Sequence, residues 1–571
     1  MSNIPVDLRE RTEAWIASDP DKKTRAELAA LLDADDVDEL SERMNGSLAF
    51  GTAGLRGRVE GGSNRMNRAV VIRTTRGLAE YLLEREPDSD RPVVVGRDAR
   101  LSSERFQKDT IGVLTAAGIL VRYFPNPVPT PIVAYAAEQL GARAAVVITA
   151  SHNPPLDNGY KVYDSNGAQI IPPTDVEIAA KIAAAPPADD VPRLSHRYRQ
   201  EMADPVPAGI FERYLQELSE IRDPDAVGSD MKIVYSPMHG VGGAYVTRAL
   251  RAFGYENILP VAEQYEPDGH FPTVAFPNPE EPGALDLANT LAAGEGADLI
   301  IANDPDTDRL AVSVKRSDGW RPLTGNQIGV LLADYLLSGT KVEKPLVLNS
   351  IVSSPMLAGI AAAHGARFET TLTGFKWIWN AALDIAAESG EEFVFGYEEA
   401  LGYSVGPAVR DKDGVSAAVI FADLAAACRN RGESVLDYLA RLYTEHGMWV
   451  STQKSIVRPG SEGAAQIADA MVRLADSAPT EVAGIDVVGT IDYRVGAESR
   501  PRYLAATPLV ELDLGDRGRV LVRPSGTEPK LKIYVDLVAA RDGSIPAEEQ
   551  ERGLVAEADE VAVAVADGLG L

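Results

Sequence analysis

One short segment of the chain combines a hydroxyl, an imidazole and an ammonium group. Residues 145–149 have an apolar, β-branched core, which predicts a buried strand, and the strand stops where Ser151 and His152 precede two prolines. Open α/β sheets place their ligand chemistry at the carboxyl ends of strands. Lys161 follows in a second extended run. We therefore expect Ser151, His152 and Lys161 to belong to one site.

Three aspartates alternate after a second apolar run. Asp304, Asp306 and Asp308 would lie on one side of an extended loop, because side chains alternate with a period of two. A calcium EF-hand would need glycine and glutamate where this chain has Arg309 and Lys315. Mg²⁺ is usually held by a few carboxylates together with a substrate phosphate. The spacing thus predicts a magnesium site.

Two further loops are suited to anions, and an acidic pair is suited to hydroxyl groups. Residues 50–58 place three glycines around Arg56, and residues 523–530 offer an arginine, two hydroxyls and a glycine after a strand. Backbone amides can approach an anion closely in such loops. Glu398 and Glu399 follow another strand and could either accept hydrogen bonds from a sugar or be surface charge.

Composition limits the class of protein. The chain has 571 residues, of which 45% are hydrophobic, and a formal charge of −28 from 84 acidic and 56 basic side chains. That charge disfavours nucleic acid and anionic membranes as partners. Cys428 is the single cysteine, so an intrachain disulfide and a thiolate metal cluster are excluded. Without an apolar targeting or membrane-spanning stretch, we expect a cytoplasmic protein.

Alternating strands and helices predict the elements that position these loops. The first 45 residues read as a helical extension with a break at Asp19-Pro20. Three units of strands alternating with helices follow, and closely spaced strands near the end indicate an antiparallel α+β module. The expected divisions are an N-terminal extension, three α/β domains and an α+β domain, at 1–45, 46–205, 206–325, 326–450 and 451–571.

Together these motifs resemble the α-D-phosphohexomutase family of phosphoglucomutases and phosphomannomutases. The resemblance covers nearly the whole chain from Phe50. It rests on four motifs in family order: TASHNP at 149–154, DPDTDR at 304–309, GYEEALG at 396–402 and RPSGTEPK at 523–530. It implies four domains around a central cleft, three related α/β domains followed by a C-terminal α+β domain.

The resemblance also implies a role for each candidate residue. Ser151 would be the phosphoserine, and its phosphate oxygen would bind one Mg²⁺ together with Asp304, Asp306 and Asp308. Charge stabilisation and proton transfer at the reacting phosphate would come from Arg56, His152 and Lys161. The remaining contacts to the sugar and its distal phosphate would be made by Arg309, Gly374, Lys376, Glu398, Arg523, Ser525, Gly526 and Thr527.

The implied reaction interconverts the 1-phosphate and 6-phosphate of a hexose, glucose or mannose. Phosphoserine 151 would donate its phosphoryl group, and the resulting sugar bisphosphate would turn over before the other phosphate returns to Ser151. Such transfer depends mainly on positioning and charge neutralisation. A sugar 1,6-bisphosphate would prime the enzyme. The partners would be small sugar phosphates, and the protein would be a monomer or a weak homodimer.

One departure from the family pattern leaves the substrate open. Hexose-specific members usually carry a serine two residues after the sugar-binding glutamate, where this chain has Ala400. A phosphopentomutase or a sugar-bisphosphate synthase of the same fold is therefore the main alternative. A non-catalytic sugar-phosphate sensor is a remote one.

A serine hydrolase is the alternative from another enzyme class, because Ser151 precedes His152. Adjacent side chains on a strand-end loop are expected to project differently, and the segment contains no G-x-S-x-G elbow. Both points argue against this alternative.

Overall fold

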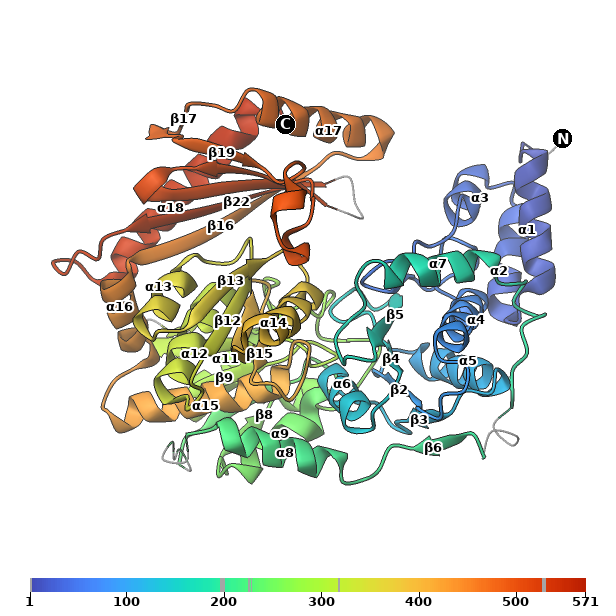
Figure 1. Ribbon diagram of the computed structural model, residues 1–571, viewed down its shortest axis with the longest axis horizontal. Helices are drawn as coiled ribbons and strands as arrows, with labels where there is room; N and C mark the ends of the chain where they lie inside the picture. The colour runs from blue at the N-terminus through green and yellow to red at the C-terminus, as the bar shows by residue number, and fades with distance from the viewer. Residues whose placement is uncertain are drawn as a thin grey trace. The chain divides into compact units, whose positions relative to one another are not determined.

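The computed structural model describes residues 3–195, 201–223, 226, 228, 230–316, 319–525 and 530–571. The chain forms two compact units (Figure 1). The first contains Met1–Pro322 and Gly402–Asp423, and the second contains Leu323–Leu401 and Leu424–Leu571.

The first unit begins with three helices, where the sequence predicts a helical extension. They are α1 (Val6–Ser18), α2 (Lys22–Asp33) and α3 (Val37–Met44). Helix α1 ends at the predicted break, and Asp21 caps α2 by accepting a hydrogen bond from the Lys23 amide. The helices enclose a small core of their own, made of Ile4, Leu8, Leu28, Leu40 and Met44.

A mixed sheet follows in the order β1-β5-β4-β2-β3-β6. Strands β2, β3, β4 and β6 run parallel, whereas β5 is antiparallel to both β4 and β1. The strands are β1 (Leu55–Arg58), β2 (Val93–Arg97), β3 (Val121–Tyr123), β4 (Ala144–Ile148), β5 (Asp157–Asp164) and β6 (Ala203–Pro205). Its helices are α4 (Arg68–Arg85), α5 (Ser103–Ala116), α6 (Thr130–Gln139) and α7 (Thr174–Ala184).

The second sheet of this unit has the order β11-β10-β9-β7-β8. It contains β7 (Ile233–Ser236), β8 (Ile258–Pro260), β9 (Leu299–Ala302), β10 (Ala311–Arg316) and β11 (Gly319–Pro322). Its helices are α8 (Ile210–Ile221), α9 (Gly242–Ala252), α10 (Ala262–Tyr265) and α11 (Asp286–Glu295). Strand β15 (Gly402–Val405) and the first part of α15 (Gly414–Asn430) complete the unit.

The second unit contains a parallel sheet and an antiparallel sheet. The parallel strands are ordered β13-β12-β14, and the antiparallel strands are ordered β16-β22-β21-β20-β19. Its strands are β12 (Pro345–Ser350), β13 (Arg367–Thr371), β14 (Glu392–Glu398), β16 (Met448–Val457), β19 (Gly489–Asp492), β20 (Val510–Asp513), β21 (Gly518–Pro524) and β22 (Lys530–Ala539), with a β17–β18 hairpin (Glu481–Val482, Ile485–Asp486). Its helices are α12 (Gly325–Gly339), α13 (Met356–Ala363), α14 (Phe375–Ser389), α16 (Val435–His446), α17 (Gly460–Asp476) and α18 (Ala547–Gly568).

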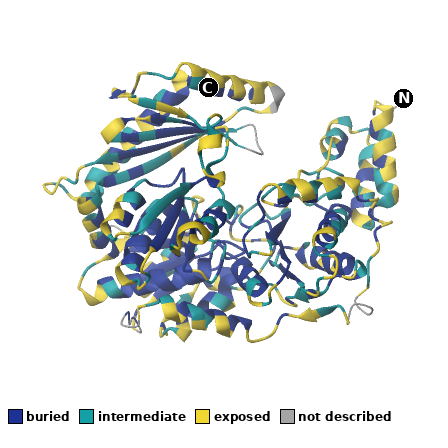
Figure 2. Cartoon of the chain, in the orientation of Figure 1, coloured by how far each residue is buried: buried dark blue, intermediate teal, exposed yellow. Residues whose placement is uncertain are grey.

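Continuous apolar runs in the sequence form the buried centres of these sheets (Figure 2). All five residues of β4 are buried, and so are all four of β9 and all six of β12. Strands covered on both faces lose the polar alternation of half-exposed strands. None of the helices in the described ranges combines the length and apolarity that a membrane span requires.

Candidate active site

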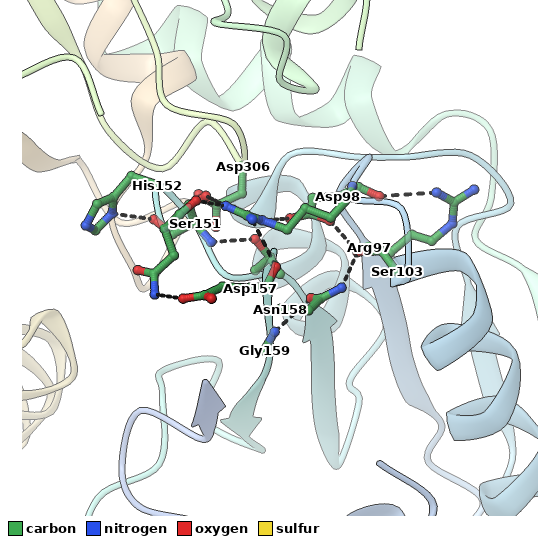
Figure 3. A network of polar contacts seen from close by, with 12 residues as sticks. Arg97, Asp98, Ser103, Ser151, His152, Asp157, Asn158, Gly159 and Asp306 are labelled. Carbon is green, nitrogen blue, oxygen red and sulfur yellow. Dashed lines mark hydrogen bonds and ion pairs between the residues drawn. The ribbon is translucent and has the colours of Figure 1, made fainter. Parts of the chain in front are cut away.

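Ser151 lies in the loop after β4, in a backbone conformation that is uncommon for a residue with a side chain. Its φ is +52°, and its amide donates to Thr149 Oγ1 at 2.8 Å. The buried hydroxyl donates to Asp304 Oδ2 at 2.8 Å and lies 3.1 Å from His152 Nδ1 (Figure 3). The expectation that the Ser151 and His152 side chains diverge is therefore wrong, because this local turn brings them together.

Arg100 binds backbone carbonyl groups of the loop that carries Ser151. One guanidinium nitrogen donates to the carbonyls of Pro154 and Asp157 at 2.7 and 2.9 Å. The other donates to those of Ser151 and Asn153 at 2.8 and 2.5 Å. One buried side chain therefore binds four backbone carbonyls of this loop.

Asp98, the residue after β2, binds Arg100 in turn. Its carboxylate lies 3.3 Å from Arg100 Nε and accepts from the Arg100 amide at 3.0 Å and from Ser103 Oγ at 2.5 Å (Figure 3). Ser103 in turn accepts from Asn158 Nδ2 at 3.0 Å. The loop is therefore fixed by a buried charge pair and its hydrogen bonds.

The three aspartates converge, but not by strand alternation. The loop after β9 is a tight turn in which Thr307 has a φ of +62° and donates its amide to the Asp304 carbonyl at 2.9 Å. One carboxylate oxygen from each of Asp304, Asp306 and Asp308 lies within 4.8 Å of the others. The predicted extended loop is thus wrong, and the predicted grouping is confirmed.

Neighbouring loops hold this turn closely. Thr130, at the start of α6, donates its amide to the Asp306 carbonyl at 2.9 Å and its hydroxyl to Asp306 Oδ2 at 2.8 Å. Gly240 approaches Pro305 so closely that an added Cβ would lie 2.4 Å from Pro305 Cα. The Val241 amide donates to the Pro305 carbonyl at 2.9 Å. These contacts leave the turn little freedom to move.

Two lysines face the aspartates. Lys161, on β5, places Nζ 2.8 Å from Oδ2 of both Asp306 and Asp308, and Lys412 places its ammonium 3.4 Å from Asp308 Oδ2. Burial opposes the charge on Lys161, but Asp306 and Asp308 outweigh it and raise its pKa. Burial likewise opposes ionisation of Asp308, yet the charge of Lys161, followed by that of Lys412, lowers its pKa. Lys161 is therefore held as a positive charge beside the aspartates.

The aspartates suit a divalent cation. Oδ1 of Asp306 and Oδ1 of Asp308 are buried and accept no hydrogen bond from any described residue. Burial and the charges of Asp306 and Asp308 raise the pKa of Asp304 well above its usual value. Unsatisfied, mutually repelling carboxylate oxygens are the hard ligands that Mg²⁺ binds. The donor set therefore fits that ion.

The other predicted residues of this unit lie beside the same loops. Arg56, exposed on β1, donates to Asn153 Oδ1 at 3.0 Å. Burial, followed by the charges of Arg309 and Arg56, lowers the pKa of His152 well below its usual value. The Arg309 amide donates to Asp304 Oδ1 at 3.1 Å, and its guanidinium lies 3.8 Å from Glu280. The first unit thus brings together Ser151, His152, Arg56, Lys161, Arg309 and the three aspartates.

A second group of predicted residues forms within the second unit. Gly374 has a φ of +117° and donates its amide to Glu398 Oε1 at 2.7 Å. Lys376, two residues later on α14, folds its side chain back toward Gly374. Arg523 donates to Thr373 Oγ1 at 2.6 Å. The predicted sugar and phosphate loops are therefore adjacent, whereas Gly526 and Thr527 lie outside the described residues.

Glu399 has hydrogen-bond partners other than those of Glu398. Its Oε2 accepts from Ser350 and Ser353 at 3.1 and 3.2 Å, and its amide donates to Ser353 Oγ at 3.0 Å. Burial and the charge of Glu398 raise the pKa of Glu399 to about 7. The two glutamates therefore have different surroundings.

Two side chains at these loops were not predicted. Arg100 acts on carbonyl groups, which leave no residue-type signal in a sequence. Lys412 stands between Asp411 and Asp413. A lysine flanked by two acids after the GYEEALG motif could have been predicted as a site residue.

Comparison with known proteins places this site in a class. Sequence models of phosphoglucomutase/phosphomannomutase domains I, II, III and the C-terminal domain match residues 47–188, 212–319, 324–446 and 472–539. The fold and site define a four-domain phosphomutase. The chain belongs to the phosphoglucomutase/phosphomannomutase family, so the α-D-phosphohexomutase resemblance is confirmed.

Several relatives resemble it over most of their length. A probable phosphomannomutase of Haemophilus influenzae is 41% identical, over 82% of this chain and 93% of its own. The phosphoribomutase of Saccharomyces cerevisiae is 37% identical, over 94% of each chain. The open form of pp63/parafusin, a phosphoglucomutase from Paramecium, has the same fold, with a TM-score of 0.70, 18% identity and coverage of 92% and 96%.

Proposed function

We propose that this enzyme moves a phosphoryl group between two positions of a sugar phosphate, with Ser151 as the carrier. The observation that carries the proposal is the buried Ser151 hydroxyl, held 2.8 Å from a carboxylate of the three-aspartate turn. Family membership supports it.

In the first half-reaction the bond between phosphorus and Ser151 Oγ breaks while a sugar hydroxyl oxygen bonds to phosphorus. The proton of that hydroxyl passes to a basic group beside the loop, for which His152 is the candidate by position, and the departing Ser151 Oγ takes up a proton to become a hydroxyl. Lys161, Lys412 and Arg56 stabilise the charge on the phosphoryl oxygens. The second half-reaction reverses these bonds with the other phosphate of the bisphosphate, which restores phosphoserine.

Asp304, Asp306 and Asp308 would hold one Mg²⁺ together with a phosphate oxygen on Ser151. Bound there, the ion would neutralise charge on the transferring group. Thr130, Gly240 and the Thr307 turn keep the three carboxylates in place.

The group in the second unit would bind the part of the substrate that does not react. Glu398 is suited to sugar hydroxyls, and Lys376 and Arg523 are suited to a phosphate. Gly374, Ser525, Gly526 and Thr527 belong to the same proposal, whereas Arg309, in the first unit, is a separate substrate-binding candidate. The bisphosphate must present each phosphate in turn, so this group must accept either one.

We propose glucose 1-phosphate or mannose 1-phosphate as the substrate, converted to the 6-phosphate and primed by a hexose 1,6-bisphosphate. The Haemophilus relative, named a probable phosphomannomutase, supports a hexose. A specific observation favours a second candidate, a phosphopentomutase: Ala400 supplies no hydroxyl beside Glu398, and the yeast relative is named a phosphoribomutase.

Turnover of glucose, mannose and ribose 1-phosphates with Mg²⁺ and a trace of hexose bisphosphate tests the proposal. Hexose activity that a Ser151→Ala variant lacks is expected. A strong preference for ribose 1-phosphate would replace the substrate and keep the mechanism. Equal activity of wild type and Ser151→Ala would refute the phosphoserine carrier.

A further inference from the structure

Lys412 is held by the residue before it as well as by the aspartate turn. Asp411 is buried and places Oδ1 3.6 Å from the Lys412 ammonium, while the same oxygen accepts from the Lys412 amide at 2.8 Å. Asp411 therefore gives Lys412 a counter-charge that is not one of the three predicted metal ligands.

The other carboxylate oxygen of Asp411 is fixed by two side chains distant in sequence. Oδ2 accepts from the Tyr163 hydroxyl at 2.5 Å and from Gln169 Nε2 at 2.7 Å. Tyr163 is fully buried, so its hydroxyl has little freedom to adopt another geometry. Hydrogen bonds to a buried carboxylate orient it, much as outer partners orient the ligands of a metal.

Strand β5 links this anchor to the aspartate turn. Tyr163 follows Lys161 by two residues, so both side chains leave the same face of the strand. Lys161 reaches Asp306 and Asp308 directly, whereas Tyr163 reaches Asp411 and so sets the position of Lys412. One rigid strand thereby fixes two ammonium groups against the same carboxylates.

Asp413, the residue after Lys412, is held by other contacts. Asp413 accepts from the Tyr214 hydroxyl of α8 at 2.6 Å and from the Val415 amide at 2.9 Å. Lys412 therefore sits between two fixed acids, and Asp411 is the one whose carboxylate also lies near the ammonium.

We propose that Asp411, held by Tyr163 and Gln169, is a positioning residue that fixes the Lys412 ammonium beside the aspartate turn. Asp411 itself touches no reacting atom. The part of the inference that concerns catalysis rests on the proposed function, and the part that concerns the geometry of Lys412 does not.

A double-mutant cycle tests the catalytic part. Asp411→Asn is expected to lower kcat by roughly 10- to 100-fold, with KM changed much less, and Tyr163→Phe is expected to lower kcat by a smaller factor. In a Lys412→Met background the further effect of Asp411→Asn should nearly vanish, because the residue acts through Lys412. Tyr135→Phe is the matched control, since it removes a 2.6 Å bond to Glu217 elsewhere in the same unit.

Chemical labelling tests the geometric part without turnover. Lys412 of the wild type should react slowly with an amine-acylating reagent, as measured by peptide mass spectrometry. Its labelling should rise by about twofold to fivefold in Asp411→Asn and Tyr163→Phe and stay unchanged in Tyr135→Phe. This result is expected even if no sugar phosphate turns over, which separates it from a failure of the proposed function.

Two outcomes would overturn the inference. One is unchanged Lys412 labelling in folded Asp411→Asn and Tyr163→Phe proteins. The other is a loss of kcat in Asp411→Asn that is equally large with and without Lys412, since that would show a general structural role. Thermal unfolding curves of all variants establish that the proteins compared are folded.

Discussion

We expect Arg100→Met to displace the loop that carries Ser151 and to leave the aspartate turn in place. The substitution removes four hydrogen bonds, to the carbonyls of Ser151, Asn153, Pro154 and Asp157. It also leaves the buried Asp98 carboxylate without its partner at 3.3 Å.

The magnitude follows from these contacts. Hydrogen bonds from a charged donor contribute about 1.5–3 kcal/mol each, but bonds that share one side chain do not add fully. Removing one partner of a buried ion pair costs about 3–5 kcal/mol. We therefore expect the first unit to lose about 3–5 kcal/mol of its free energy of unfolding. Because a displacement of about 1 Å in a reacting group can cost about 100-fold, kcat should fall by at least that factor.

Steady-state turnover with Mg²⁺ and a bisphosphate primer, together with urea unfolding, measures both effects. Arg97→Met is the matched control, because Arg97 Nη1 donates to the Asp98 carbonyl at 3.2 Å and contacts no carbonyl of the serine loop. Arg100→Lys should be intermediate, since one ammonium cannot replace a planar guanidinium that serves four carbonyls. The reasoning is refuted if folded Arg100→Met keeps kcat within about threefold of Arg97→Met.

Three further predictions concern the aspartate turn and the acidic pair. Asp308→Asn should weaken Mg²⁺ binding by at least about tenfold in calorimetry, since it removes one of three convergent carboxylates; unchanged affinity would place the ion elsewhere. Gly240→Ala should lower the free energy of unfolding by about 1–3 kcal/mol and weaken Mg²⁺ binding, because its Cβ would lie 2.4 Å from Pro305 Cα. Gly294→Ala, with open space around it, should change neither quantity. Equal stability and Mg²⁺ affinity of the two variants would contradict this. The pKa of Glu399 is raised to about 7, so the folded protein disfavours its ionisation, and the free energy of unfolding should decline as pH rises from about 5 to above about 7. In urea unfolding, Glu399→Gln should flatten that decline. An unchanged slope of stability against pH would disprove this.

Local sequence was sufficient to predict many of the strands and helices and the grouping of the three aspartates. Apolar runs such as those of β4 and β9 predict buried strands, because covered strands need apolar side chains on both faces. Three aspartates within five residues stay close whatever the backbone does, so their grouping was predictable even though the extended loop was wrong. Ser151, at the end of an apolar strand, was found for the same local reason.

Tertiary structure alone decided how the side chains meet. The positive φ angles of Ser151 and Thr307 bring His152 beside the serine hydroxyl and fold the aspartates together, and no residue type at either position signals such a backbone. Arg100 and Lys412 come from other segments, and they contact the Ser151 carbonyl and the Asp308 carboxylate across a long distance in sequence. Long-range packing sets those contacts, so the sequence determines which groups are present and the fold determines which of them touch.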